Sequence, residues 1–102
     1  MTTPRETVAK SRGRQPESAI LQQVRDWLRW RGWYVIRTQQ GLGCHKGLSD
    51  LVCIRDGRVV WVEVKTATGR LSVHQEGFRG AIETHGGEYV VARCVEDVEV
   101  LR

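Results

Sequence analysis

The chain has 102 residues, 40% of them hydrophobic and 27% charged, and a formal net charge of +4 at pH 7. This length suits one domain with a modest core, and it has neither an apolar run near the ~18 residues of a membrane span nor a signal-peptide core, so we expect a cytoplasmic protein. The three cysteines form no C-x-x-C pair, which argues against a zinc site and a disulfide framework, and Cys53 is expected in the core.

The first fifteen residues differ from the rest of the chain in charge. Four basic residues and one acid in this segment carry +3 of the net +4. We expect a flexible basic arm that supplements binding to a polyanion, with a solubilising tail as an equal alternative. Residues 16–102 are expected to form the folded domain.

Residues 17–31 have the periodicity of an amphipathic helix. Leu21, Val24 and Leu28 are spaced three and four apart, and Gly32 supplies a stop signal. Glu17 lies one turn before Leu21, which places a carboxylate on the buried stripe. It is either an ordinary first-turn acid favoured by the helix dipole or a residue that points into a site.

A strand and a glycine-rich loop follow this helix. Residues 33–38 alternate and are rich in β-forming side chains, which predicts the first strand. Residues 39–48, Q-Q-G-L-G-C-H-K-G-L, predict a loop that matches neither a Walker loop nor a dinucleotide fingerprint. Lys46 in this loop is a candidate phosphate contact, whereas His45 is assigned no catalytic role.

The central feature of the sequence is a predicted hairpin with charged residues at one end. Strands 50–55 and 58–65 flank the turn dipeptide D-G, so Asp50 should lie beside Glu63 and Lys65 at one sheet edge. Two carboxylates and an ammonium on an apolar hairpin would hold a divalent metal beside a proton-handling group. A structural, buried ion pair is the alternative.

A second helix is predicted over residues 73–84. The preceding S-V-H-Q has the form of a capping box, in which Gln75 reaches back to the N-cap Ser72. Gln75 also shares the inward face with Phe78, so it either serves the cap or turns toward the site.

Residues 88–94 predict a fourth strand, and residues 95–102 are too short to assign. The element order is therefore α-β-β-β-α-β. This order predicts an α/β protein with a small mixed β-sheet flanked by helices.

These motifs together resemble the PD-(D/E)xK nuclease superfamily and, within it, the VRR-NUC group, including the compact stand-alone forms of phages and bacteria. The resemblance spans residues 16 to about 93 and lies in Glu17, G-L-S-D at 47–50, E-V-K at 63–65 and G-R-L-S-V-H-Q at 69–75. It implies a restriction-endonuclease-like core. Ser49 replaces the proline of the name-giving pattern, and Phe78 stands where relatives often carry tryptophan; neither position does chemistry.

The resemblance also implies a set of site residues: Glu17, Asp50, Glu63, Lys65 and Gln75. Asp50, Glu63 and the Val64 carbonyl would bind the metal, with Glu17 acting directly or through water. Mg²⁺ is the expected cofactor, with Mn²⁺ as a substitute and no small-molecule cofactor. Candidates for nucleic-acid contact are Lys46, Arg70 and Ser72.

The leading functional hypothesis is a metal-dependent DNA endonuclease. The stand-alone relatives imply a homodimer that acts on branched DNA such as four-way junctions. Four tryptophans are many for so short a chain, and Trp30 and Trp33 are expected at a dimer interface, stacked on an opened base, or at the edge of the core. The competing hypotheses are a non-catalytic nucleic-acid-binding module and a structural protein.

Overall fold

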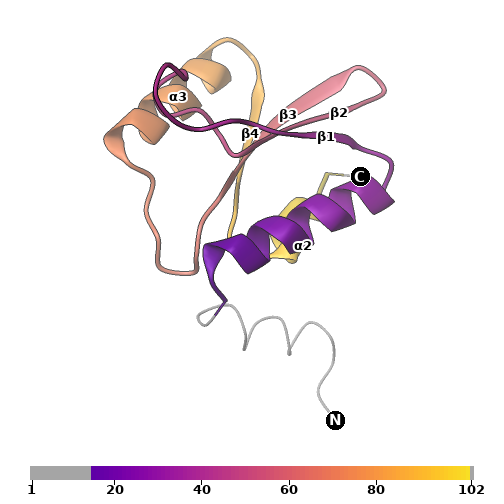
Figure 1. Ribbon diagram of the computed structural model, residues 1–102. Coiled ribbons are helices and arrows are strands. Elements are labelled where there is room, and N and C mark those ends of the chain that lie inside the picture. Colours follow the sequence, from indigo (N-terminus) through magenta and orange to yellow (C-terminus); the bar gives the residue numbers. More distant parts are fainter. Residues whose placement is uncertain (1–14, 102) are drawn as a thin grey trace.

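The computed structural model describes residues 15–101 as a four-stranded sheet with a helix on each face (Figure 1). The predicted arm, apart from Gln15, lies outside the described residues. The predicted order of helices and strands is confirmed, and a short 3₁₀ helix follows the last strand. The elements are α2 (Glu17–Trp30), β1 (Tyr34–Arg37), β2 (Leu51–Arg55), β3 (Arg58–Val64), α3 (Val73–Thr84), β4 (Glu88–Ala92) and η1 (Val95–Val98).

The sheet is mixed, with strand order β1-β2-β3-β4. β1, β2 and β3 pair antiparallel, whereas β4 pairs parallel to β3 because α3 crosses over between them. The β2–β3 turn has positive φ at both Asp56 (52°) and Gly57 (80°), as a type I′ hairpin turn requires. Leu51 pairs with Val62, so Asp50, which precedes β2, lies opposite Glu63.

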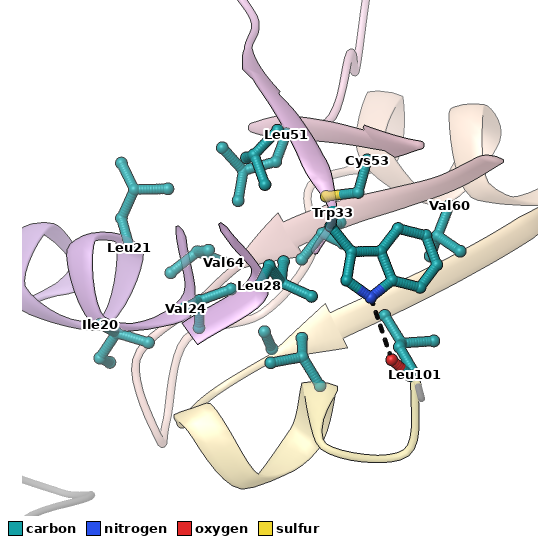
Figure 2. Packing of buried hydrophobic residues seen from close by; sticks show 14 residues of the cluster. Ile20, Leu21, Val24, Leu28, Trp33, Leu51, Cys53, Val60, Val64 and Leu101 are labelled. Atoms are coloured by element: carbon teal, nitrogen blue, oxygen red, sulfur yellow. Dashed lines mark hydrogen bonds between the residues drawn. The ribbon is translucent and has the colours of Figure 1, made fainter. Parts of the chain in front are cut away.

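The core lies between the sheet and α2 (Figure 2). The helix contributes the stripe of apolar residues that its periodicity predicts, and Cys53 is fully buried as expected. The cluster consists of Ile20, Leu21, Val24, Leu28, Trp33, Val35, Leu51, Cys53, Val60, Val62, Val64, Ala92, Val98 and Leu101.

Of the three positions expected for Trp33, the structure supports the core, because only 3% of its surface is exposed. Its indole Nε1–H donates to the carbonyl oxygen of Leu101 at 3.1 Å (Figure 2). A buried indole needs such an acceptor, and the chain end supplies it. Trp33 is therefore available neither for a dimer interface nor for base stacking, whereas Trp30 is 78% exposed.

The opposite face of the sheet is covered only in part. Phe78 of α3 makes edge-to-face contacts with Trp61 and Tyr89, at ring centroid distances of 5.4 and 6.3 Å. Strands β1 and β3 keep apolar side chains exposed on this face: Tyr34, Ile36 and Val59. Over residues 15–101, no helix has the length and apolar character needed to cross a membrane.

Candidate active site

Backbone and side-chain contacts fix Asp50 at the edge of the sheet. Its carboxylate Oδ2 accepts a hydrogen bond from the Val64 backbone N–H at 2.8 Å, which ties it to the end of β3. Its carbonyl oxygen accepts from the Thr38 N–H at 2.9 Å, which ties it to the end of β1. The neighbouring Ser49 is buried, and its hydroxyl donates to the Leu51 carbonyl. Asp50 thus has a defined position although it follows a glycine-rich loop.

Glu63 is the buried carboxylate of the site, with 2% of its surface exposed. Its Oε2 accepts from the Gln75 side-chain amide at 3.0 Å and lies 3.4 Å from the Lys65 ammonium nitrogen. Its Oε1 is buried and has no hydrogen-bond partner within residues 15–101. A buried carboxylate oxygen without a donor is costly, so this atom marks a position where a ligand is expected.

Three carboxylates converge at this point. One oxygen from each of Glu17, Asp50 and Glu63 lies within 4.8 Å of the others. Glu17 differs from its predicted placement: it is exposed rather than on the buried stripe, because the first residue of α2 extends past the core. It still brings its carboxylate to the other two. The structure therefore gathers the three acids named from the sequence.

The charge of this cluster is poorly compensated. Burial, and next the negative charge of Asp50, raise the pKa of Glu63 from its ordinary 4.5 to about 7, although nearby Lys65 opposes the shift. A carboxyl group whose ionised form is this unfavourable gains strongly from a bound cation. Strongly perturbed carboxyl groups of this kind are concentrated at functional sites.

The donor set fits a divalent metal ion. Carboxylate oxygens are the ligands that Mg²⁺ and Mn²⁺ prefer, and the Oε1 atom of Glu63, which has no hydrogen-bond partner in the described part of the chain, provides one. Val64 lines the same cavity as Glu17 and Asp50, while the role of its carbonyl as a ligand stays a prediction.

Gln75 serves both roles between which the sequence left a choice. Its side-chain Oε1 accepts from the Ser72 backbone N–H at 2.9 Å, and its backbone N–H donates to the Ser72 hydroxyl at 3.1 Å, which completes the predicted capping box. Its side-chain amide nitrogen Nε2 donates to Oε2 of Glu63. The cap therefore orients the amide that holds the buried carboxylate.

The predicted nucleic-acid contacts lie on loops and at a helix start around the acids. Lys46, Arg70 and Ser72 are all exposed, although the Ser72 hydroxyl oxygen already accepts within the cap. The loop that carries Lys46 packs on α3, since a Cβ at Gly47 would lie 2.0 Å from the His74 carbonyl oxygen. Their contact with nucleic acid stays a prediction.

Two arginines near the site were missed by sequence reasoning. Arg93 donates from Nη1 to the carbonyl oxygens of Thr66 and Gly69, at 2.7 and 2.6 Å, and so fastens the loop after Lys65. Arg37 lines the cavity beside the acids. Only the strand register could have indicated Arg37, which pairs with Leu51 next to Asp50.

A mixed four-stranded sheet with a crossover helix before its last strand thus carries the acid cluster at one edge. No family model and no curated protein matches the sequence. A solved structure described as a VRR_NUC domain is similar to this chain, with a TM-score of 0.70 and 18% sequence identity over 83% of this chain and 91% of that chain. The VRR-NUC-like fold predicted from the motifs is therefore confirmed.

Proposed function

We propose that this protein is a metal-dependent DNA endonuclease that hydrolyses phosphodiester bonds. One observation carries the proposal: the buried Glu63, with one carboxylate oxygen unpartnered in the described chain, lies within 4.8 Å of Asp50 and Glu17 ligand atoms. The VRR-NUC-like fold supports it, because the similar structure is described as a VRR_NUC domain.

Asp50, Glu63 and the Val64 carbonyl would hold the metal, with Glu17 completing the set directly or through water. Mg²⁺, or Mn²⁺ in its place, would supply Lewis-acid activation of the phosphoryl group and of the attacking water. Asp50 and Glu63 lie at the ends of β2 and β3, and Glu17 lies at the start of α2. The metal would therefore link α2 to the β2–β3 hairpin.

Lys65 and Gln75 lie on the Oε2 side of the Glu63 carboxylate. The Lys65 ammonium, 3.4 Å from Glu63 Oε2, would orient or help deprotonate the attacking water and stabilise the charge that develops on phosphate. Gln75 is a positioning residue, because its amide occupies Oε2 of Glu63 and leaves Oε1 without a partner among residues 15–101.

The activity is tested with a panel of end-labelled DNAs: linear duplex, single strand, flap, splayed arm and four-way junction, each incubated with Mg²⁺, Mn²⁺ or EDTA. We expect cleavage with either metal, none with EDTA, and a loss of at least a hundredfold in Lys65→Ala while DNA binding survives. Arg29→Ala, an exposed cation in the last turn of α2, is the control that keeps full activity.

Two outcomes of this panel contradict the proposal. Absence of cleavage under every condition, with binding retained in Asp50→Ala and Glu63→Ala, would assign the chain to non-catalytic nucleic-acid binding. Undiminished cleavage by Lys65→Ala would remove the lysine from the mechanism.

We further propose a homodimer that acts on branched DNA. The side chains of Tyr34, Ile36 and Val59, which are apolar and exposed on the sheet face opposite α2, support this assembly because a second copy could cover them. Two sites related by a two-fold axis would suit a symmetric four-way junction.

Light scattering should give twice the chain mass, and Ile36→Glu should give a monomer that cuts junctions less than wild type relative to linear DNA. A monomeric wild type, or equal cleavage of junction and linear duplex, contradicts this assembly.

A further inference from the structure

A cavity of about 250 Å³ lies beside the acid cluster, on the side of the sheet that α2 covers. Its lining is Glu17, Ser18, Leu21, Arg37, Asp50 and Val64. Two of the three clustered carboxylates and one cationic side chain thus share this cavity. Its volume corresponds to roughly eight times the share of one water in the liquid, which leaves room for a phosphate group and part of its hydration.

Arg37 reaches this cavity from the last position of β1. Alternation along the strand puts its side chain on the same face as the buried Val35, toward α2. Glu63 and Lys65 share the opposite face, toward α3, where Gln75 binds Glu63. The acid cluster therefore has a lysine on one side of the sheet edge and an arginine on the other.

The guanidinium of Arg37 has no hydrogen-bond or ion-pair partner among residues 15–101, although Glu17 and Asp50 line the same cavity. Its N–H groups, fixed in a planar fork, remain available to a ligand. An anion with two oxygens in one plane, such as a phosphodiester, matches that fork better than it matches a lysine ammonium.

We propose that Arg37 binds a backbone phosphate next to the scissile one, which makes the cavity a second phosphate subsite. The proposal rests on the proposed nuclease function, because the acid cluster is taken to hold the scissile phosphate through its metal. The cut strand then crosses the sheet edge from the Lys65 face to the Arg37 face. Arg37 fixes the register of that strand.

The first test measures binding without cleavage. The affinity for a labelled duplex is measured in Ca²⁺ over a range of NaCl concentrations for wild type, Arg37→Gln, Arg37→Lys and Arg29→Gln. Arg29 is the matched control, since it loses the same charge about 18 Å along α2 from Glu17.

Loss of one phosphate contact should reduce the slope of log K against log[salt] by about 0.9 in Arg37→Gln, and weaken binding about tenfold at low salt. Arg37→Lys keeps the charge but lacks the planar fork, so its affinity for the duplex should lie between those of wild type and Arg37→Gln. Arg29→Gln should retain the wild-type slope. Equal slopes in wild type and Arg37→Gln, or equal losses in Arg37→Gln and Arg29→Gln, overturn the proposal.

The second test locates the phosphate by charge deletion. A neutral methylphosphonate replaces one phosphate at a time on either side of the mapped cut in the labelled strand, and single-turnover cleavage is measured. At one neighbouring linkage the substitution should slow wild type about tenfold and leave Arg37→Gln no slower than it already is. Equal slowing of both proteins at every linkage overturns the subsite.

The two failures are distinguishable. If wild type cuts no DNA, the nuclease function fails while the salt slopes still decide whether Arg37 binds a phosphate. If wild type cuts but the slopes and the methylphosphonate effects are independent of Arg37, the nuclease function stands and the subsite is wrong. A melting temperature within a few degrees of wild type shows that each variant is folded.

Discussion

Replacing the buried Glu63 by glutamine should remove a pH-dependent destabilisation of the fold. The pKa of Glu63 is raised to about 7 in the folded protein from an ordinary value of 4.5, chiefly because burial disfavours the carboxylate. The folded state then holds this proton more tightly than the unfolded chain. Stability from this group is complete below about pH 4.5, falls as the pH rises toward 7, and is lost above about pH 7.

The magnitude follows from the shift. A shift from 4.5 to about 7 corresponds to about 3 kcal/mol of unfolding free energy. In a domain of about 100 residues that is a difference in melting temperature on the order of 10–20 °C. Glu63→Gln has the same shape as the protonated residue and lacks this titration.

The assay is thermal unfolding at pH 5 and pH 8 in EDTA, followed by circular dichroism, for wild type and Glu63→Gln. Groups outside the acid cluster titrate alike in both proteins, so the difference between them reports the removal of the Glu63 carboxyl group. The stability of wild type relative to the variant should fall by about 2–3 kcal/mol between pH 5 and pH 8. Parallel pH curves for the two proteins would refute the reasoning.

Three further predictions concern other parts of the structure. Gly47→Ala should destabilise the fold more than Gly43→Ala, because both glycines have positive φ but only a Cβ at Gly47 would lie 2.0 Å from the backbone oxygen of His74. Urea unfolding of both variants measures the difference, and an equal loss of unfolding free energy in the two would contradict the packing of this loop on α3. Trp33→Phe should lower the free energy of unfolding by about 1–3 kcal/mol, because it leaves the buried Leu101 carbonyl without its hydrogen-bond donor. An unchanged melting temperature would contradict the closure of the core by residue 101. Mg²⁺ at pH 8 should raise the melting temperature of wild type but not that of Asp50→Asn. This variant keeps an acceptor for the Val64 N–H but loses the negative charge. An equal rise in both proteins would place the metal elsewhere.

The features that the sequence predicted correctly depend on neighbours along the chain. The D-G pair specifies a type I′ turn, and Ser72 and Gln75, three positions apart, specify a capping box. The hairpin turn in turn sets the register that places Asp50 opposite Glu63. The acid site could therefore be predicted from local rules and the family resemblance together.

The features that were missed depend on contacts between distant segments. The position of Trp33 was left open among a dimer interface, base stacking and the edge of the core, because its acceptor, the Leu101 carbonyl, lies 68 residues further along the chain. Arg37 was missed because its proximity to Asp50 arises from the β1–β2 register, across the loop of residues 38–50, which carries no pairing signal. Glu17 was placed on the buried stripe because periodicity does not indicate where the core ends.

That Glu17, Asp50 and Glu63 form a metal centre is tested most directly by titrating the protein with Mn²⁺ and counting bound ions by electron paramagnetic resonance. Wild type should bind Mn²⁺ at this centre, and Glu63→Gln should weaken that binding at least tenfold because it removes a charged ligand. Glu76→Gln, at an exposed acid in the first turn of α3, should bind as wild type does. Equal Mn²⁺ affinity in wild type and Glu63→Gln would contradict the metal centre.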